Sequence, residues 1–308
     1  MHYVVGDVHG CYDDLMAMLN TIESKDKDAI IYFVGDFIDR GPKVWETLNW
    51  CLENITADGK YQSVLGNHED LVMKWYYKNS NENAMIKNLE PCLYGFDAIL
   101  IENDINYIQE LKPIVDFWES LPLYKRVSVD RVNSVKQEYI IAHAFAPKNK
   151  EEIADKNDDE VRDIYLWSRQ HFWGYYGDAI LVHGHTPTVD HDYMLRGERK
   201  PGFINYRHNA INVDGGCVLF STHFETSPCM LCAICLETLE EIYPYDWEKR
   251  MRSADYVGTN SLHFDDMTQN EINLLMKEHR IDRFKEVLNR VDGDVGDRKL
   301  LLKRMGLL

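Results

Sequence analysis

Short apolar runs alternate with polar residues through the first two thirds of the chain. Six runs rich in β-branched residues are each followed by a Gly, Asp, Asn or His; they occupy residues 3–5, 30–34, 63–65, 139–142, 180–182 and 211–213. Runs of this length are typical of strands buried on both faces. Between the first two runs, apolar residues recur at helical spacing, at Leu15, Met16, Leu19 and Ile22. The pattern therefore opens with a βαβ unit and predicts an α/β fold.

Two segments depart from this rhythm and have a helical pattern. Residues 72–122 carry several aromatic residues and are expected to form a helical cap over the strand ends. Residues 246–308 hold two amphipathic stretches, at 268–291 and 297–308. All 17 excess negative charges fall in residues 1–245, because acidic and basic residues balance after that point. We therefore predict a catalytic domain over 1–245 and a helical C-terminal extension over 246–308.

Charge and hydropathy exclude several classes of partner. The 308 residues include 51 Asp+Glu against 34 Lys+Arg, a formal net charge of −17. A nucleic-acid backbone needs a basic surface, so no nucleic-acid partner is expected. Apolar runs stay well short of the roughly 18 residues that a membrane span needs, and the chain opens without a signal-peptide pattern. A cytoplasmic location, with no membrane partner, is therefore expected.

Seven cysteines are scattered along the chain, and a reducing compartment predicts that they are free thiols. Cys229, Cys232 and Cys235 have a C-x2-C-x2-C spacing that superficially resembles metal-binding motifs. No further Cys or His follows nearby, and the surrounding MLCAICL is apolar throughout. We interpret this segment as a buried strand in which the cysteines act as small apolar residues.

Metal-binding residue types follow the predicted strands. In open α/β sheets ligands bind at the carboxyl ends of the strands, where these residues lie. They are Asp7, His9, Asp36, Asn67, His143 and His185. Each alone has an ordinary structural explanation, but together their oxygen and nitrogen donors suit two divalent cations, with Mn²⁺, Fe or Zn²⁺ preferred. A carboxylate at Asp36 can bridge two ions roughly 3.5–4 Å apart.

Five motifs carry a resemblance to a known family. They are GDVHG at 6–10, GDFIDRG at 35–41, GNHE at 66–69, IAHA at 141–144 and HGHTP at 183–187. In this order and spacing the series resembles the calcineurin-like metallophosphoesterases, and is most similar to the bacterial and phage PPP-type serine/threonine phosphatases. The resemblance covers residues 1 to about 240. It implies a two-sheet β-sandwich flanked by helices, with a dimetal site at the strand ends.

The resemblance also implies a role for each matched residue. Asp7, His9 and the bridging Asp36 would hold one metal ion, while Asp36, Asn67, His143 and His185 would hold the other. His68 resembles the general acid of the family, and Asp39 resembles its carboxylate partner. Arg40, Arg169 and Asn67 would bind the substrate phosphate. Arg169 rests on a shorter W-x-R motif, and the alternative is a surface arginine that follows a core Trp167.

Three functions remain open on this basis. The first is phosphomonoester hydrolysis by a serine/threonine protein phosphatase, with a phosphorylated protein or a small phosphoester as substrate. Asp39, Glu69 and Pro187 favour it, since Pro187 stands where many phosphodiesterases of the wider family carry a second histidine. The alternative is symmetrical dinucleoside tetraphosphate hydrolysis, by relatives that share GDVHGCYD. The third is a non-catalytic binding module. Residues 186–212 carry Arg196, Arg199, Lys200, Arg207 and His208 and form either a solvated hairpin or a basic lip for the substrate.

Overall fold

The computed structural model describes residues 1–245 except for 81–83, 132–135, 171–174, 189–201 and 220–228. The predicted C-terminal extension, with both of its amphipathic stretches, lies outside these residues. So do Arg196, Arg199 and Lys200 of the predicted basic lip. The domain boundary at residue 245 therefore stays a prediction.

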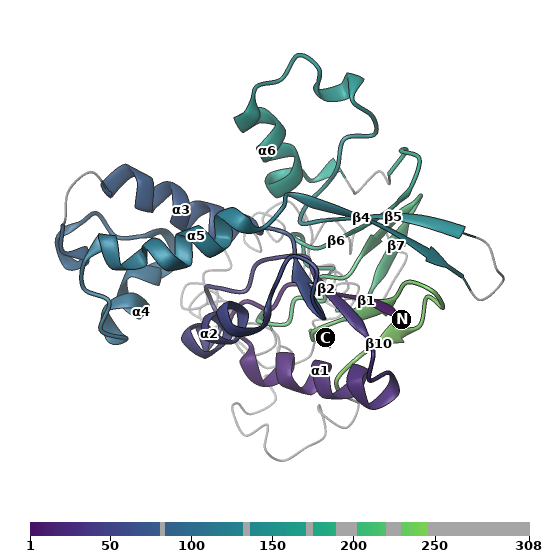
Figure 1. Ribbon diagram of the computed structural model, residues 1–308, viewed down its shortest axis with the longest axis horizontal. Helices are drawn as coiled ribbons and strands as arrows, with labels where there is room; N and C mark the ends of the chain where they lie inside the picture. Colours follow the sequence, from purple (N-terminus) through teal and green to yellow (C-terminus); the bar gives the residue numbers. More distant parts are fainter. Residues whose placement is uncertain (81–83, 132–135, 171–174, 189–201, 220–228, 246–308) are drawn as a thin grey trace, which may run out of the picture.

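Two five-stranded sheets form the centre of the described chain (Figure 1). The first sheet has the order β10-β9-β1-β2-β3, with β1 at His2–Val5, β2 at Ile30–Phe33, β3 at Tyr61–Ser63, β9 at Ala233–Cys235 and β10 at Glu241–Ile242. The second has the order β4-β5-β6-β8-β7, with β4 at Tyr124–Asp130, β5 at Lys136–Ala142, β6 at Ile180–His183, β7 at Asn205–Arg207 and β8 at Ala210–Asn212. Strands β1, β2 and β3 are parallel, as are β5, β6 and β8. The outer strands pair antiparallel.

Side-chain alternation along the strands shows that the sheets pack face to face. Val4 and Val64 of the first sheet pack in one buried cluster with Tyr139, Ile141 and Val182 from the second. Neighbouring residues of the same strands point the other way and join different clusters. Both faces of each central strand are thus buried, which explains their continuous apolar runs. The predicted β-sandwich is confirmed.

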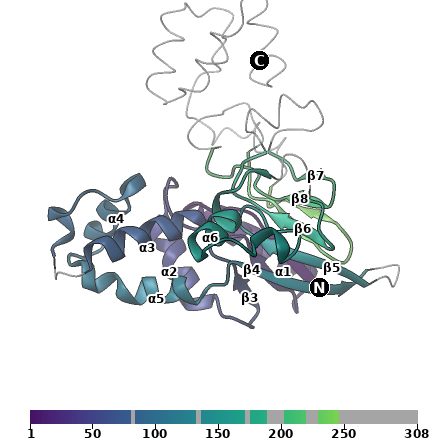
Figure 2. The same cartoon turned by 90° about the horizontal axis from the view of Figure 1, so that it is seen from above.

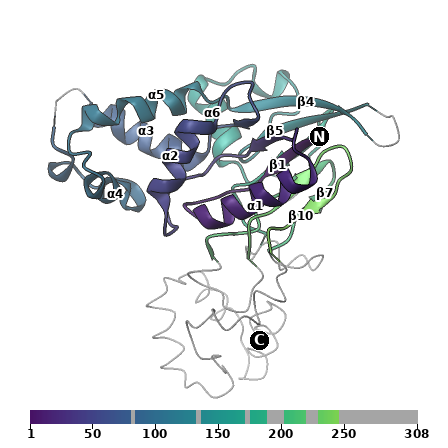
Figure 3. The same ribbon diagram turned by 60° about the horizontal axis from the view of Figure 1, so that its bottom comes forward.

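Helices cover the outer faces of both sheets (Figures 1 and 3). α1 at Tyr12–Lys25 and α2 at Val44–Asn54 pack on the first sheet, and α6 at Asp158–Trp167 packs on the second. Within α1, Leu15, Leu19 and Ile22 are buried as expected, but Met18 and not Met16 completes the buried stripe. Met18 lies three residues after Leu15 and four before Ile22, so it shares their helical face.

The predicted helical cap projects from the sandwich as a lobe (Figures 1 and 2), and its buried apolar cluster continues into α2 and α6. It contains α3 at Asn67–Asn79, α4 at Phe96–Glu102, α5 at Lys112–Ser120 and three 3₁₀ turns, η1 at Ile86–Asn88, η2 at Leu93–Gly95 and η3 at Ile108–Leu111. A fourth turn, η4 at Glu151–Ile153, precedes α6. Trp118 and Phe96 are fully buried in this lobe. The described part of residues 72–122 is thus mainly helical, while its role as a cap over the strand ends stays a prediction.

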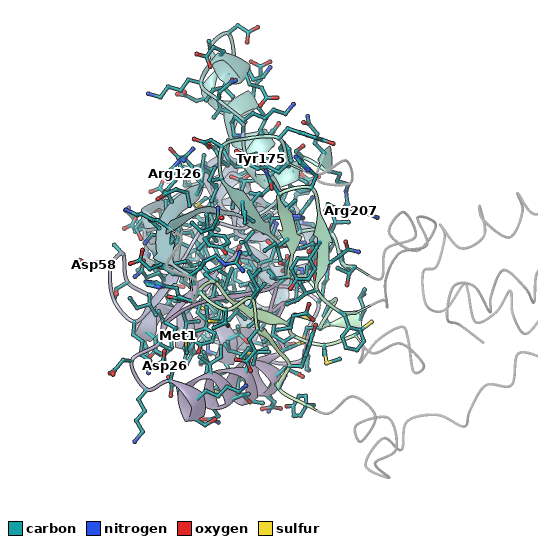
Figure 4. The ribbon with its side chains drawn as sticks, turned by 90° about the vertical axis from the view of Figure 1, so that its right-hand side faces the viewer. Met1, Asp26, Asp58, Arg126, Tyr175 and Arg207 are labelled. Atoms are coloured by element: carbon teal, nitrogen blue, oxygen red, sulfur yellow. The ribbon has the colours of Figure 1, made fainter. Side chains whose placement is uncertain are left out.

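Strand β4 is half-exposed and alternates regularly. Val127 and Val129 are buried between the sheets, whereas Arg126 and its alternate neighbours are exposed. Figure 4 shows Arg126 and Tyr175 at the end of the molecule opposite Met1 and Asp26. Tyr175 is fully buried against the outer face of the second sheet. β7 and β8 pair as an antiparallel hairpin, which is the described part of the predicted 186–212 hairpin.

All seven cysteines are buried with their thiols reduced, as the sequence predicts. The C-x2-C-x2-C residues do not converge: the Cys232 sulfur lies 3.4 Å from the Gly202 carbonyl oxygen, while the Cys235 sulfur lies 3.8 Å from the Met1 sulfur. Regular strand geometry covers only Ala233–Cys235 of this segment. Across the helices that the structure describes, none combines the length and apolar character of a membrane span.

Candidate active site

The carboxyl ends of the parallel strands of both sheets meet at one end of the sandwich. Asp7 follows β1, Asp36 follows β2 and Asn67 opens α3 after β3, while His143 and His185 follow β5 and β6 of the second sheet. The backbone N–H of His185 donates to Asp7 Oδ2 at 3.0 Å, which joins the two sheets directly. Parallel pairing brings strand ends to a common edge, so residues far apart in sequence become neighbours.

Asp36 occupies the centre of this cluster. Two groups of potential metal ligands have their donor atoms within 4.8 Å of one another: His9, Asp36 and His68, and Asp7, Asp36 and His143. Asp36 belongs to both groups, as a bridging carboxylate must. The grouping differs from the predicted assignment, because Asp7 lies with His143 and His68 lies with His9.

Asn67 and the second-sheet histidines complete the arrangement. The Asn67 Oδ1 atom lies 2.6 Å from His143 Nε2 and 2.9 Å from His185 Nδ1. His143 Nδ1 faces the Val34 carbonyl oxygen at 2.8 Å, so it must carry the proton, and Nε2 presents a lone pair to the amide oxygen. His9 is oriented in the same way by the Ile38 carbonyl oxygen, 2.8 Å from Nδ1. Backbone carbonyls that orient imidazoles in this manner are typical of metal-ligating histidines.

The donor set fits divalent cations on several counts. Lone pairs of Asn67 and His143 face each other, an arrangement that a cation between or beside them would stabilise. Asp7 Oδ1 and His185 Nε2 are buried and make no hydrogen bond within the described part of the chain. Buried polar atoms without partners are costly, and metal coordination removes that cost. The residues present therefore fit a two-metal centre.

The pKa shifts agree with this reading of the donors. Burial, followed by the charges of Asp214 and Asp36, raises the pKa of Asp7 well above its usual range. Burial lowers the pKa values of His9, His143 and His185, so these imidazoles stay neutral and keep a lone pair for a ligand. A site that combines crowded carboxylates with neutral imidazoles therefore favours the binding of cations.

Backbone strain is concentrated at the site. The residues with φ between +45° and +70° include His9, Asp36, Asp39, Arg40 and His185. The left-handed region is unfavourable for side chains other than glycine, and such strain is commonly found at functional sites. The strand-end turns are also closely packed, because a Cβ on Gly184 would lie 1.9 Å from Asp7 Oδ1. The turns that place the ligands are therefore tightly constrained.

His68 is a buried histidine whose two ring nitrogens face charged side chains. Its Nδ1 lies 2.6 Å from Asp39 Oδ2, as the family resemblance implies for an acid and its partner. Arg40 contacts the other ring nitrogen of His68. Its guanidinium nitrogens lie 2.9 Å from His68 Nε2 and 2.9 Å from His9 Nε2. One lone pair of His9 cannot serve both Arg40 and a metal ion, so metal binding would release that guanidinium arm towards a substrate.

Arg169 lies on the second-sheet side of the same site. Its Nη1 donates to Thr186 Oγ1 at 3.0 Å, and its charge is among the contributions that lower the pKa of His185, after burial and His143. Trp167 is 36% exposed and its ring edge faces the His185 ring at 5.9 Å. Trp167 is therefore not a core residue, as the alternative supposed, whereas Arg169 is exposed, so its role in phosphate binding stays a prediction.

Three further residues of the site were not predicted. Glu69 is fully buried and accepts the backbone N–H groups of Asp36 at 3.0 Å and Phe37 at 2.8 Å. Burial and the charge of Asp36 raise the pKa of Glu69 to about 7. Asp214 follows β8 and is buried; burial raises its pKa to about 7. Its place after an apolar run is the same signal that identified Asp7, so the sequence contained the evidence for it.

Tyr94 is the third, and no periodic signal marks it. It lies in η2 of the helical lobe with φ +65°, and its ring is 52% exposed. The ring centroid is 4.6 Å from that of His68, and the Arg40 guanidinium carbon lies 5.4 Å from the Tyr94 centroid. Besides the residues at the start of α3, the lobe thus contributes the aromatic side chain of Tyr94 to the site.

Comparisons with known proteins agree with this geometry. The chain is 27% identical over 228 residues to the asymmetrical bis(5'-nucleosyl)-tetraphosphatase PrpE of Halalkalibacterium halodurans, covering 70% of this chain and 85% of that one. It is 40% identical over 68 residues to the symmetrical bis(5'-nucleosyl)-tetraphosphatase of Neisseria gonorrhoeae, but this covers only 22% of this chain and 24% of the other.

A solved metallophosphoesterase from Sphaerobacter thermophilus superposes with a TM-score of 0.42 at 16% identity, over 82% of this chain and 94% of that one. Residues 3–189 match the family described as Calcineurin-like phosphoesterase. That match spans more than half of the chain and contains the predicted ligands and both arginines that are predicted to bind phosphate. The chain is a hydrolase that belongs to the calcineurin-like phosphoesterase family.

Proposed function

We propose that the protein hydrolyses dinucleoside tetraphosphates, by direct attack of water on phosphorus at a two-metal centre. The single structural observation that carries the hydrolytic step is Asp36, which belongs to both groups of potential ligands. The named relatives supply the substrate class: the PrpE relative, matched over 85% of its length, is named as an asymmetrical tetraphosphatase. This reverses the order that the sequence motifs favoured, in which a serine/threonine protein phosphatase came first.

The position of cleavage is proposed from the same comparison. Symmetrical cleavage of diadenosine tetraphosphate yields two ADP, whereas asymmetrical cleavage yields ATP and AMP. The match to a symmetrical enzyme covers only 22% of this chain, but the match to the asymmetrical PrpE covers 70%. We therefore favour asymmetrical cleavage over the symmetrical reaction that the sequence motifs offered as the alternative.

The chain supplies the ligands and the phosphate-binding groups. Asp7, His9, Asp36, Asn67, His143 and His185 would hold two divalent cations, with Mn²⁺ the first choice and Fe or Zn²⁺ the others. Such ions lower the pKa of water and stabilise charge on the attacking and leaving oxygens. Buried Asp36 and the neutral imidazoles of His9 and His143 suit this role.

His68, held by Asp39, would deliver a proton to the leaving oxygen. Arg40 and Arg169 approach the cluster from opposite sides, since one contacts His9 and the other contacts Thr186 beside His185. Their planar guanidinium groups bind phosphate oxygens in pairs and would orient the reacting phosphate for in-line attack. Asn67, which faces His143 and His185, would contact both a cation and the substrate phosphate.

Hydrolysis of phosphoserine or phosphothreonine is the second candidate. The observation that favours it is the 2.6 Å contact between His68 and Asp39, because protonation of a leaving group matters most for a poor one such as a serine alkoxide. A phosphoanhydride leaves as a phosphate and needs this assistance less. The two candidates thus predict different substrate rankings from one shared site.

A substrate panel with Mn²⁺ tests the proposal. Purified protein is compared on diadenosine tetraphosphate, a phosphoserine peptide and an aryl phosphodiester, with nucleotide products separated by chromatography. We expect the highest kcat/KM on diadenosine tetraphosphate, with ATP and AMP as products. Two ADP would indicate symmetrical cleavage, and faster turnover of the peptide would favour the protein phosphatase. Asp36→Asn should be inactive on every substrate, while Glu237→Gln, outside the site, serves as the matched control.

A further inference from the structure

A second cluster of potential metal ligands lies beside the catalytic one and contains sulfur. Cys11, Asp14 and Cys217 place two thiol sulfurs and a carboxylate oxygen within 4.8 Å of one another. The two cysteines are 6% and 5% exposed, and Asp14 is partly exposed. The sequence spacing gives no hint of this cluster, because more than 200 residues separate the cysteines.

Fixed backbone on both sides holds the cluster together. Cys11 directly precedes α1, with its N–H donating to the Val8 carbonyl at 3.0 Å, and Asp14 lies in the first turn of the same helix. Cys217 belongs to the turn after β8, in which the Gly216 N–H donates to Asp214 Oδ1 at 2.9 Å. The two turns are parts of one buried apolar cluster. The donor atoms are therefore brought together by the fold and not by a flexible loop.

We propose that Cys11, Asp14 and Cys217 form a binding site for a soft divalent cation such as Zn²⁺ or Cd²⁺. Thiolate sulfur selects for such ions over Mn²⁺ and Mg²⁺. Two sulfurs and one carboxylate leave a fourth position of a tetrahedral zinc site for water. Both thiols release their protons to solvent when the ion binds, so the ion replaces two S–H groups with two metal–sulfur bonds.

Because of the position of the cluster, an ion bound there would connect two turns of the fold. One of the turns it joins carries His9, and the other carries Asp214. Catalytic cations are held by oxygen and nitrogen donors, whereas this ion would be held mainly by sulfur. An ion that binds only the folded chain stabilises it by mass action. The ion would therefore fasten the turn after β1 to the turn after β8 without taking part in hydrolysis.

Cobalt spectroscopy tests the site without any activity measurement. Reduced, chelator-treated full-length protein is titrated with Co²⁺, and absorption from sulfur-to-cobalt charge transfer is recorded in the near ultraviolet. We expect a band that saturates with added Co²⁺ and is lost in Cys11→Ser and in Cys217→Ser. Cys51→Ser, a buried cysteine of the same apolar cluster, is the matched control and should keep the band. The proposal is overturned if the wild type gives no such band or if both serine variants retain it.

A second measurement needs no variant and covers the case in which the serine variants fail to fold. Wild-type protein is saturated with Mn²⁺, given one equivalent of Cd²⁺, and studied by X-ray absorption at the cadmium edge. We expect sulfur in the first coordination shell of cadmium, at about two sulfurs per ion. A shell of oxygen and nitrogen alone would contradict the proposal. Neither experiment depends on the substrate, so failure here and failure of the proposed hydrolysis are separate results.

Discussion

Crowded buried carboxylates define the candidate site at the scale of single residues. Asp7, Asp36 and Asp214 are each no more than 3% exposed. Burial and mutual repulsion raise the pKa of Asp7, and burial raises that of Asp214 to about 7. Packing acidic groups together in this way is costly unless cations neutralise them. The individual side chains thus already favour cations, and the resemblance to a metal-dependent family is explained by their physical chemistry.

His68 has two possible roles, and one substitution separates them. It lies with His9 and Asp36 in a potential ligand group, but its Nδ1 contacts Asp39 as a general acid would. We expect His68→Asn to lower kcat on an alkyl phosphate by about 10²–10⁴-fold, as for loss of a general acid. Bound Mn²⁺ per chain, measured by mass spectrometry after gel filtration, should be unchanged. Loss of one Mn²⁺ per chain would instead make His68 a ligand.

Glu69 supports the site through the backbone and gives a second test. Its carboxylate accepts the N–H groups of Asp36 and Phe37, and these hydrogen bonds hold Asp36 in its strained conformation. A glutamine has only one acceptor oxygen, and its amide would face an N–H donor. We expect Glu69→Gln to lower the free energy of unfolding by about 1–3 kcal/mol, the cost of an unsatisfied buried group. Urea unfolding measures it; an unchanged free energy would mean that Glu69 does not hold this turn.

Strand ends and the turns that follow them set the geometry at the scale of elements. Gly184 follows β6, and a Cβ there would lie 1.9 Å from Asp7 Oδ1 after β1. We expect Gly184→Ala to push Asp7 away and weaken Mn²⁺ binding by about 10–100-fold, the range seen when support for a ligand is lost. Mn²⁺ titration with a calorimeter measures the affinity. Gly59→Ala is the control, because its Cβ would meet only the rotatable Thr56 side chain; equal effects would refute the argument.

The helical lobe contributes to the site through Tyr94. An aromatic ring close to an exposed guanidinium contributes about 0.5–1 kcal/mol, and the Tyr94 ring lies 5.4 Å from the Arg40 carbon. We therefore expect Tyr94→Ala to lower kcat/KM by about two- to fivefold, while Tyr94→Phe stays near wild type. Tyr77→Ala is matched in exposure and lies in the same lobe. If it lowers kcat/KM equally, the effect comes from the lobe as a whole and not from contact with Arg40.

Over the whole molecule, the local pattern predicted most of the site residues that follow strand ends, with Asp214 after β8 as an exception. Asp7, Asp36, Asn67 and His143 were identified because each directly follows a buried apolar run, and parallel pairing then brings them together. Tyr94 could not be predicted, since its contact with His68 depends on how η2 packs against the start of α3.

The sulfur cluster was missed for the same reason as Tyr94. The spacing of Cys229, Cys232 and Cys235 is conspicuous but brings no sulfurs together, whereas Cys11 and Cys217 converge only because β1 and β8 end at the same edge. The motifs did not separate the candidate substrates, because Asp39 and Arg40 indicate phosphate chemistry, which monoesters and anhydrides share. Sequence motifs therefore indicate that a phosphate group reacts. The residues that surround this phosphate depend on tertiary packing, which the motifs do not predict.

A carboxylate just after β9, an inner strand of the first sheet, makes the stability of the whole sandwich depend on acid pH. Glu237, after β9, accepts the backbone N–H of His2 at 3.0 Å, and its carboxylate lies 2.6 Å from the His2 ring. Burial acts to raise the pKa of Glu237, but these hydrogen bonds outweigh it and lower the pKa below 4.5. A carboxylate with a lowered pKa stabilises the fold above its unfolded pKa, and this contribution is lost as pH falls through the folded value.

We therefore expect wild-type protein to exceed Glu237→Gln by about 1 kcal/mol in free energy of unfolding at pH 6, a small value because His2 is partly exposed. Below pH 4.5 the difference should shrink as the wild-type carboxylate takes up a proton. Urea unfolding at pH 6, 5, 4 and 3 measures the trend. Glu240→Gln, which removes only an exposed pair with Lys25, should show little difference at any pH. A gap between wild type and Glu237→Gln that stays constant with pH would show that the carboxylate charge does not hold β1 to the turn after β9.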